Sequence, residues 1–420
     1  MSNSHVWNGP SRPNAELVSV ENLSRIVRGL PARAQMVLRS LVQMDKGTLE
    51  LTIPDGRTLL IRGREQGPTA AVTLHNWNLP QRAIAGGTIA VAESYMDGDW
   101  ESPDVGAFLE LFLANKHVGD RFSNGARGLL RLFERFRHWM NQNTKEGSRR
   151  NISAHYDLGN DFYREWLDPT MTYSSALYEN GETDIVAAQT AKYRALATAT
   201  GIKPGDHVLE IGCGWGGFAE FAAREIGCKV TGLTISKEQL AFATDRIKKA
   251  GLDHLVTLKF QDYRDEQGQY DHIISIEMFE AVGEKYWPVY FSKLRDCLKP
   301  GGSAGLQIIT IKPEAYRDYR ANPDFIQKYV FPGGMLPTEE HLDELSASVG
   351  LKETSDFGFG RDYARTLAEW RVRFWSVWER LKPLGFDERF KRLWEFYFFY
   401  CEAGFRDGNI DVRQMVYRKA

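Results

Sequence analysis

The sequence predicts an α/β protein in which a doubly wound, largely parallel sheet follows a small α+β domain. An apolar run at 208–211 leads directly into Gly212, Gly214 and Gly216, and then into a helical pattern. A strand, a glycine-rich turn and a helix form the nucleotide-binding opening of such a sheet. Strands and helices then alternate along the chain, which favours parallel strands joined by right-handed crossovers. Two strands joined by a tight turn within 48–62 belong to the smaller domain.

The composition is that of an ordinary globular protein. Its 420 residues correspond to two or three domains at about 150 residues each. The net charge of −2 provides no global attraction to nucleic acid. The four cysteines have neither metal-type spacing nor a pairing pattern, so no metal site is predicted and a reducing cytoplasm is favoured. The sequence has no signal peptide and no run of about 20 apolar residues, so we expect any membrane contact to be peripheral.

The N-terminal region is predicted to contain a leader and a compact domain. Residues 1–20 include two prolines and many polar side chains, which is typical of a mobile terminus. Residues 21–120 form the predicted α+β domain, because strand patterns and a tight turn lie between helical patterns. Its predicted elements are a helix at 23–42, strands at 48–53, 57–62 and 70–77, and a helix at 105–114.

A basic segment follows at 121–150, with eight Lys or Arg residues and only two acids. Leucines and aromatic residues interleave with these charges at helical spacing. Such an amphipathic helix can lie on an anionic membrane surface, or it can be a linker helix that packs on the core. Nucleic acid is a weaker possibility, because no nucleic-acid-binding module accompanies the basic residues.

Residues 151–420 form the predicted catalytic domain. Aromatic residues are concentrated at 370–400, where they either line an apolar tunnel or form the core between helices. The predicted elements are helices at 184–200 and 237–250, and strands at 207–211, 229–234, 256–260, 271–276 and 304–311.

The glycine turn has the spacing E-x-G-x-G-x-G, beginning at Glu210. This spacing differs from the dinucleotide motif G-x-G-x-x-G, and no Lys-Ser/Thr pair follows that would indicate a P-loop. It resembles the S-adenosylmethionine (SAM) motif of class I methyltransferases. The resemblance implies that Glu210 and the three glycines bind SAM.

Polar residues follow the next two predicted strands and complete a predicted adenosine pocket. An acid in this region can accept a hydrogen bond from the adenine amino group, and an aromatic ring can stack on the base. Because the carboxyl ends of parallel strands share one edge of the sheet, we expect these residues to lie together. They are Thr234, Ser236, Gln239, Asp262 and Tyr263.

Four separated stretches accompany the glycine turn. They are AHYDLGNDFYREWLDPTMTYSSALY (154–178), SIEMFEAVG (275–283), YVFPGGMLP (329–337) and YCEAGFR (400–406). In this order they resemble the cyclopropane fatty acid synthase family, which includes the mycolic acid cyclopropane synthases. The N-terminal part resembles the small lipid-binding domain that precedes the catalytic domain in bacterial members.

The resemblance implies transfer of a methylene or methyl group from SAM to the double bond of an unsaturated phospholipid acyl chain, with a cyclopropane as the leading product. An alkene is a poor nucleophile, so the methyl group must be held in line with it in a dry site. Attack leaves a carbocation, which the aromatic faces of Tyr173, Phe279 and Tyr363 are candidates to stabilise. Tyr173 and Ser174 also match positions that contact SAM in the family.

A base must then remove a proton from the transferred methyl group to close the ring. In the family this base is a bicarbonate ion. The resemblance assigns its site to Ser175, Glu280, Gln307, Ile309 and Tyr363. Ser175 and Gln307 stand where the family has Cys and His, and neither offers imidazole charge. A methyl-branched, unsaturated product without ring closure is therefore the alternative, and the neighbouring Glu277 leaves a purely structural role open for Glu280.

Two further functions are left open by the sequence. One is a lipid-binding protein without catalysis, against which the intact Glu210, glycine turn and Glu280 argue. The other is a methyltransferase that acts on a soluble small molecule. The expected location is the cytoplasm, with peripheral association at the inner face of the membrane. The bacterial relatives suggest a homodimer.

Overall fold

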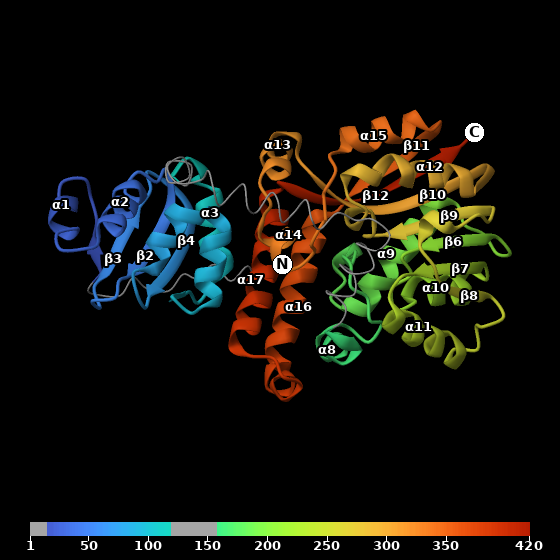
Figure 1. Cartoon of the computed structure of the whole chain (residues 1–420), viewed down its shortest axis with the longest axis horizontal. Coiled ribbons are helices and arrows are strands. Elements are labelled where there is room, and N and C mark those ends of the chain that lie inside the picture. The colour runs from blue at the N-terminus through green and yellow to red at the C-terminus, as the bar shows by residue number, and fades with distance from the viewer. Residues whose placement is uncertain (1–14, 119–157) are drawn as a thin grey trace. The chain divides into compact units, whose positions relative to one another are not determined.

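The computed structural model describes residues 15–118 and 158–420 (Figure 1). The predicted basic segment at 121–150 lies outside the described residues, as does most of the predicted leader at 1–20. Residues near the end of that leader lie in a strand, and the mobility of the leader stays a prediction. Glu16–Leu17 forms the short strand β1, because it pairs in parallel with residues of the next strand but one along the chain.

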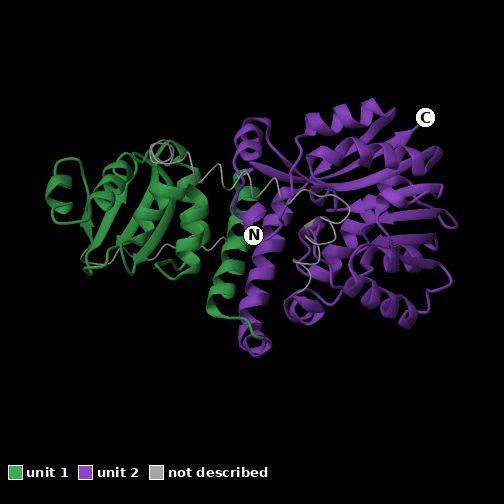
Figure 2. Ribbon diagram, in the orientation of Figure 1, with its two compact units in different colours: residues 1–134, 385–407 green, residues 135–384, 408–420 purple. Residues whose placement is uncertain are grey.

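The chain forms two compact units (Figure 2), one of residues 1–134 with 385–407 and one of residues 135–384 with 408–420. The first unit includes the range 21–120 that was predicted as a small domain, and its role in lipid binding stays a prediction. The predicted range 151–420 for the second domain differs from this division, because 385–407 groups with the first unit. That segment carries the helix α17 (Glu388–Asp407), which contacts the helices α3 (Asn78–Met96) and α4 (Val105–Leu113) of the first unit.

The first unit is a five-stranded sheet with helices, in the strand order β1-β3-β2-β4-β5. Its other strands are β2 (Lys46–Thr52), β3 (Thr58–Arg62), β4 (Glu65–Leu74) and β5 (Trp100–Glu101). Its other helices are α1 (Leu23–Ile26), α2 (Ala32–Leu41), α3 (Asn78–Met96) and α4 (Val105–Leu113). The single helix predicted at 23–42 is divided in two, because Gly29 is left-handed and Pro31 caps α2. Helix α3 was not predicted, and the left-handed Gly87 kinks it.

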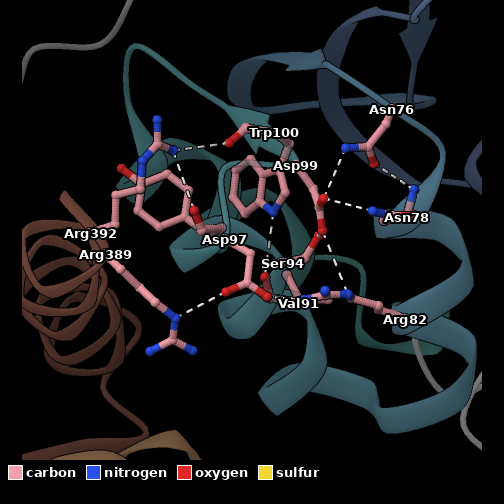
Figure 3. A network of polar contacts seen from close by, with 11 residues as sticks. Asn76, Asn78, Arg82, Val91, Ser94, Asp97, Asp99, Trp100, Arg389 and Arg392 are labelled. Carbon is pink, nitrogen blue, oxygen red and sulfur yellow. Dashed lines mark hydrogen bonds and ion pairs between the residues drawn. The ribbon is translucent and has the colours of Figure 1, made fainter. Parts of the chain in front are cut away.

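Polar contacts hold α17 in the first unit (Figure 3). Arg389 donates to Asp97 at 3.0 Å, and Arg392 donates to the carbonyl oxygens of Tyr95 and Trp100 at 3.3 and 3.4 Å. The Tyr95 hydroxyl donates to Glu395 at 3.0 Å, and both of these residues are buried. Several aromatic residues of 390–399 are therefore core residues of the first unit, as one of the two interpretations predicted.

The second unit contains a seven-stranded sheet in the order β11-β12-β10-β9-β6-β7-β8. The five strands from β10 to β8 are mutually parallel, and β12 is antiparallel to both β10 and β11. The strands are β6 (His207–Ile211), β7 (Lys229–Thr234), β8 (Val256–Phe260), β9 (Tyr270–Ile276), β10 (Leu298–Ile311), β11 (Leu351–Gly358) and β12 (Ile410–Lys419). This topology confirms the predicted fold class. Strands β6 and β9 are neighbours in the sheet although β7 and β8 lie between them in the chain, so the strand order reverses between β6 and β9.

Helices cover both faces of this sheet (Figure 1). Val208 packs in one apolar cluster with residues of α9, α10 and α11, whereas its neighbour Leu209 packs in another with residues of α12 and α15. This alternation follows from the two-residue period of a strand. The helices are α8 (Gly159–Trp166), α9 (Ile185–Thr200), α10 (Gly217–Phe221), α11 (Lys237–Lys249), α12 (Trp287–Cys297), α13 (Pro313–Ala321), α14 (Phe325–Tyr329), α15 (Glu339–Ser348) and α16 (Gly360–Leu381).

The five strands and two helices predicted for the second unit are all present, and the largest difference is that β10 begins at Leu298 where residue 304 was predicted. The final strands β11 and β12 were not predicted. Within the described parts of the chain, the structure contains no helix that combines the length and the apolar character needed to span a bilayer.

Candidate active site

The glycine turn between β6 and α10 has a backbone conformation that is unfavourable for residues with a Cβ atom. Gly212, Gly214 and Gly216 have φ values of +85°, +51° and +82°, in the left-handed region that favours glycine. A Cβ atom on Gly212 would lie 2.8 Å from the Met278 side chain. On Gly214 it would meet no atom of the described residues within 4 Å. The turn therefore packs against the residues that follow β9 and is open beside Gly214.

Glu210 lies at the end of β6 and is buried, with one carboxylate oxygen that has no hydrogen-bond partner among the described residues. Burial raises the pKa of Glu210 to about 8, and the positive charges of Arg246 and Lys192 oppose this rise. A buried acceptor without a partner is costly unless a ligand supplies a donor. The unpartnered oxygen and the open glycine turn thus fit the polar adenosyl group of SAM.

The residues predicted after β7 are buried together at the start of α11. The Ser236 hydroxyl accepts from the Gln239 N–H at 3.2 Å and so caps the helix. The Thr234 hydroxyl donates to the Gln239 side chain at 3.1 Å and accepts from the Ser236 N–H at 3.1 Å. The structure therefore assigns these side chains a local structural role, and their contact with a cofactor stays a prediction.

Asp262, after β8, has a strong partner that the sequence interpretation did not include. Its carboxylate accepts from the Arg264 guanidinium at 2.8 and 2.6 Å and from the Arg264 N–H at 3.0 Å. The adjacent Tyr263 ring lies 5.3 Å from that of Tyr290, edge to face. Contact of the Asp262 carboxylate with a cofactor stays a prediction.

A second group of polar residues surrounds Glu277, which directly follows β9. One Glu277 oxygen accepts from the Ser175 N–H and from the Gln307 amide, both at 2.8 Å. The other accepts from the Tyr363 hydroxyl at 2.6 Å. We call these four residues the Glu277 cluster. Three of its members were predicted as ligands of an anion, but the acid at its centre was not. The Ser175 hydroxyl itself donates to the Ala176 carbonyl, so its backbone makes the contact.

Glu280 lies one turn further along the chain. One of its oxygens accepts from the Ile309 N–H at 2.5 Å, and the other has no partner among the described residues. Burial and the neighbouring charge of Glu277 raise the pKa of Glu280 to about 8. Burial also raises the pKa of Glu277, against the opposing effects of the Tyr363 hydroxyl and the Lys192 charge. Both buried acids are therefore harder to ionise than a solvated carboxyl, and Glu277 has more hydrogen-bond donors than Glu280.

Lys192 of α9 interacts electrostatically with both Glu210 and the Glu277 cluster. Its side chain is fully buried, and its ammonium donates to the Ser174 hydroxyl at 2.6 Å. Burial lowers the pKa of Lys192 to about 7, while the charges of Glu277, Asp168 and Glu210 oppose that effect. A signal for this residue was present in the sequence, because Lys192 occupies an apolar face of the helix. The sequence marked Glu277 only by its proximity to Glu280, because the hydrogen-bond partners of Glu277 come together only in the fold.

Aromatic rings lie beside the Glu277 cluster. The Tyr173 ring is 5.2 Å from Trp370, and Tyr363 is 6.1 Å from the same indole. Trp370 is buried, and its N–H has no hydrogen-bond partner among the described residues. Phe279 differs from the prediction, because it is buried in the core against Trp287, with ring centroids 5.5 Å apart. Of the three predicted aromatic candidates, Tyr173 and Tyr363 therefore share Trp370 as a neighbour, and Phe279 packs in the core.

Comparison with known proteins matches most of the chain. The sequence model of the family described as mycolic acid cyclopropane synthetase matches residues 143–415, which contain all the site residues named here. Tuberculostearic acid methyltransferase of Mycobacterium tuberculosis is 39% identical over 344 residues, or 80% of each chain. The cyclopropane-fatty-acyl-phospholipid synthase of Escherichia coli is 36% identical over 357 residues, which cover 83% of this chain and 88% of that protein.

Solved structures of cyclopropane synthases are also similar to this chain. A mycolic acid cyclopropane synthase complexed with SAH and CTAB has a TM-score of 0.61 at 29% identity, covering 64% of this chain and 98% of its own. A cyclopropane synthase of Mycobacterium tuberculosis has a TM-score of 0.61 at 31% identity, with the same coverage.

Proposed function

Because the chain belongs to the mycolic acid cyclopropane synthetase family and is a SAM-dependent methyltransferase, we propose that it converts the double bond of an unsaturated phospholipid acyl chain into a cyclopropane. The observation that carries the proposal is the acid pair Glu277 and Glu280 beside the glycine turn. Methyl transfer to an alkene leaves a cation on carbon, and ring closure then requires a base for a C–H proton. The acid pair supplies that base at the point where the strand order reverses.

The residues at the end of β6 are proposed to hold the cofactor. When bound, SAM supplies an electrophilic methyl group on a positively charged sulfur. Glu210 offers an unpartnered acceptor, and Gly214 leaves open space for close approach to the backbone. The Ser174 hydroxyl accepts from Lys192, whose ammonium interacts with the charges of Glu210 and Glu277, and Ser174 and the adjacent Tyr173 are proposed to complete the cofactor site.

The rings of Tyr173, Tyr363 and Trp370 are proposed to stabilise the cation on the acyl chain. Aromatic faces attract cations within about 6 Å of the ring centroid, and the attraction is stronger where water is excluded. Their clustering at 5.2 and 6.1 Å supports this role. The same rings provide an apolar surface against which the acyl chain can lie.

The test is mass spectrometry of cis-monounsaturated phosphatidylglycerol vesicles incubated with the protein and SAM that carries a fully deuterated methyl group. A cyclopropane retains two of the three deuterium atoms and resists ozonolysis, because the double bond is lost. A product that retains all three and still contains an alkene would refute ring closure and identify a fatty-acyl methylase. SAM binding without any lipid product would refute both cyclopropane formation and methylation of the acyl chain.

We further propose that the protein acts in the cytoplasm as a homodimer that associates peripherally with the inner face of the membrane. The basic sequence at 121–150 supports attraction to anionic lipid. Sedimentation with phosphatidylglycerol vesicles tests the association, which should weaken when Arg127, Arg131 and Arg135 are replaced by Gln. Analytical ultracentrifugation tests the dimer. Vesicle binding that these replacements do not change would exclude a role for this segment.

A further inference from the structure

The carboxylate of Glu277 accepts hydrogen bonds from residues that were predicted to hold a bicarbonate ion. It accepts from the Ser175 N–H, the Gln307 amide and the Tyr363 hydroxyl at 2.6 to 2.8 Å. The N–H of Ile309, also predicted to hold that anion, donates to Glu280 instead. An acid of the chain itself thus accepts from three of the groups that were predicted to hold the anion.

The backbone of Glu277 indicates that this arrangement is imposed by the fold. Its φ is +49°, and Met171 is the only other non-glycine residue with positive φ in the described ranges 15–118 and 158–420. This conformation is unfavourable for a side chain with a Cβ and persists only where the surroundings enforce it. Here the Glu277 N–H donates to the Gln307 carbonyl at 2.8 Å, so the backbone and the side chain of Glu277 are both held by Gln307.

We propose that Glu277 is the proton acceptor for ring closure, in place of a dissolved anion; this inference rests on the proposed function. In this step a C–H bond of the added methyl group breaks. Its electron pair forms the third ring bond to the cationic carbon, and the proton goes to a carboxylate oxygen of Glu277. The three donors occupy about three of the four acceptor positions of the carboxylate, which leaves one beside the Tyr363 hydroxyl for the proton.

The environments of the two acids distinguish their roles. Glu277 has three hydrogen-bond donors, and each of them stabilises its ionised form. Glu280 has one donor and an unpartnered oxygen, which favours its neutral form. Where two acids differ in this way, the ionised one is suited to accept a proton. Lys192 adds a positive charge that also favours an ionised Glu277.

The experiment compares Glu277→Gly and Glu277→Gln with the intact protein, in buffer freed of carbon dioxide and again with added bicarbonate. Vesicles of cis-monounsaturated phosphatidylglycerol and labelled SAM are the substrates. We expect the intact protein to form the same amount of cyclopropane with and without bicarbonate. Both variants should lose roughly 100-fold or more in rate, as removal of a general base does.

Bicarbonate should partly restore Glu277→Gly but not Glu277→Gln. Glycine tolerates the left-handed backbone and leaves the three donors accessible to a small anion, whereas the Gln side chain fills that space. Glu344→Gln, which makes the same chemical change at an exposed position of α15, is the matched control and should remain fully active. Calorimetric titration with SAM should give similar affinities for all four proteins.

Three results would overturn the assignment. They are a requirement of the intact protein for bicarbonate, full activity of Glu277→Gly without bicarbonate, and loss of SAM binding in both Glu277 variants. The last would show that Glu277 only supports the glycine turn. Failure of the proposed function gives a different result, namely no lipid product from the intact protein although SAM is bound.

Discussion

The Tyr363→Phe substitution isolates one hydrogen bond of the Glu277 cluster. The Tyr363 hydroxyl donates to Glu277 at 2.6 Å, and phenylalanine retains the ring that lies 6.1 Å from Trp370. A hydrogen bond to a charged group contributes about 1.5 to 3 kcal/mol. Since about 1.4 kcal/mol corresponds to a tenfold change in a proton equilibrium, the pKa of Glu277 should rise by roughly one to two pH units.

The measurement is kcat/KM for lipid product across the acidic pH range. The acidic limb of that profile reports the pKa of the base in the free enzyme. Loss of the Tyr363 donor disfavours the ionised carboxylate, so the limb should move to higher pH by the same one to two units. Tyr286→Phe, which removes a hydroxyl outside the cluster, should leave the profile unchanged. An acidic limb that does not move in Tyr363→Phe would refute the reasoning.

Three further predictions concern the glycine turn, the second acid and the first unit. Gly212→Ala should weaken SAM binding at least tenfold in calorimetry and lower the free energy of unfolding by about 1–2 kcal/mol, because alanine is strained at positive φ. The raised pKa of Glu280 should lower the free energy of unfolding as the pH rises from 4.5 to 8, and Glu280→Gln should abolish this contribution. The folded state binds this proton more tightly than the unfolded state, and one such group costs at most about 1.4 kcal/mol per pH unit; an unchanged urea-unfolding profile would contradict it. Tyr95→Phe should lower stability by about 1–2 kcal/mol, since it removes a buried donor to Glu395, and an unchanged denaturation midpoint would contradict that.

Local patterns in the sequence were sufficient to predict the parallel sheet. The strands β6 to β9 are short segments with several β-branched or other apolar residues, a glycine follows β6 directly, and a helix cap follows β7 after one residue. These are interactions between near neighbours in the chain, so periodicity and turn chemistry identify them. The strands β11 and β12 escaped prediction because charged and polar residues interrupt both of them, so neither contains the continuous apolar run of a buried parallel strand.

The division of the helical aromatic region was decided only by tertiary contacts. The sequence at 370–400 has one aromatic composition throughout. Its first part lies in α16 of the second unit, and its last part lies in α17, whose partners are α3 and α4. Composition shows that such residues will be buried, but it does not show against which element they pack.

In the candidate site, too, the sequence identified residues but not the contacts between them. The sequence by itself identified the glycine turn, Glu280, Gln307 and Tyr363, because each lies in a recognisable stretch. Only the fold brought Ser175, Gln307 and Tyr363 to within hydrogen-bond distance of Glu277, from segments 30 to 102 residues away from it. The pKa of a carboxyl depends on burial and on charges a few ångströms away, which are properties of the folded chain. The sequence therefore determined which chemistry the protein carries, and the tertiary structure decided which acid stands at its centre.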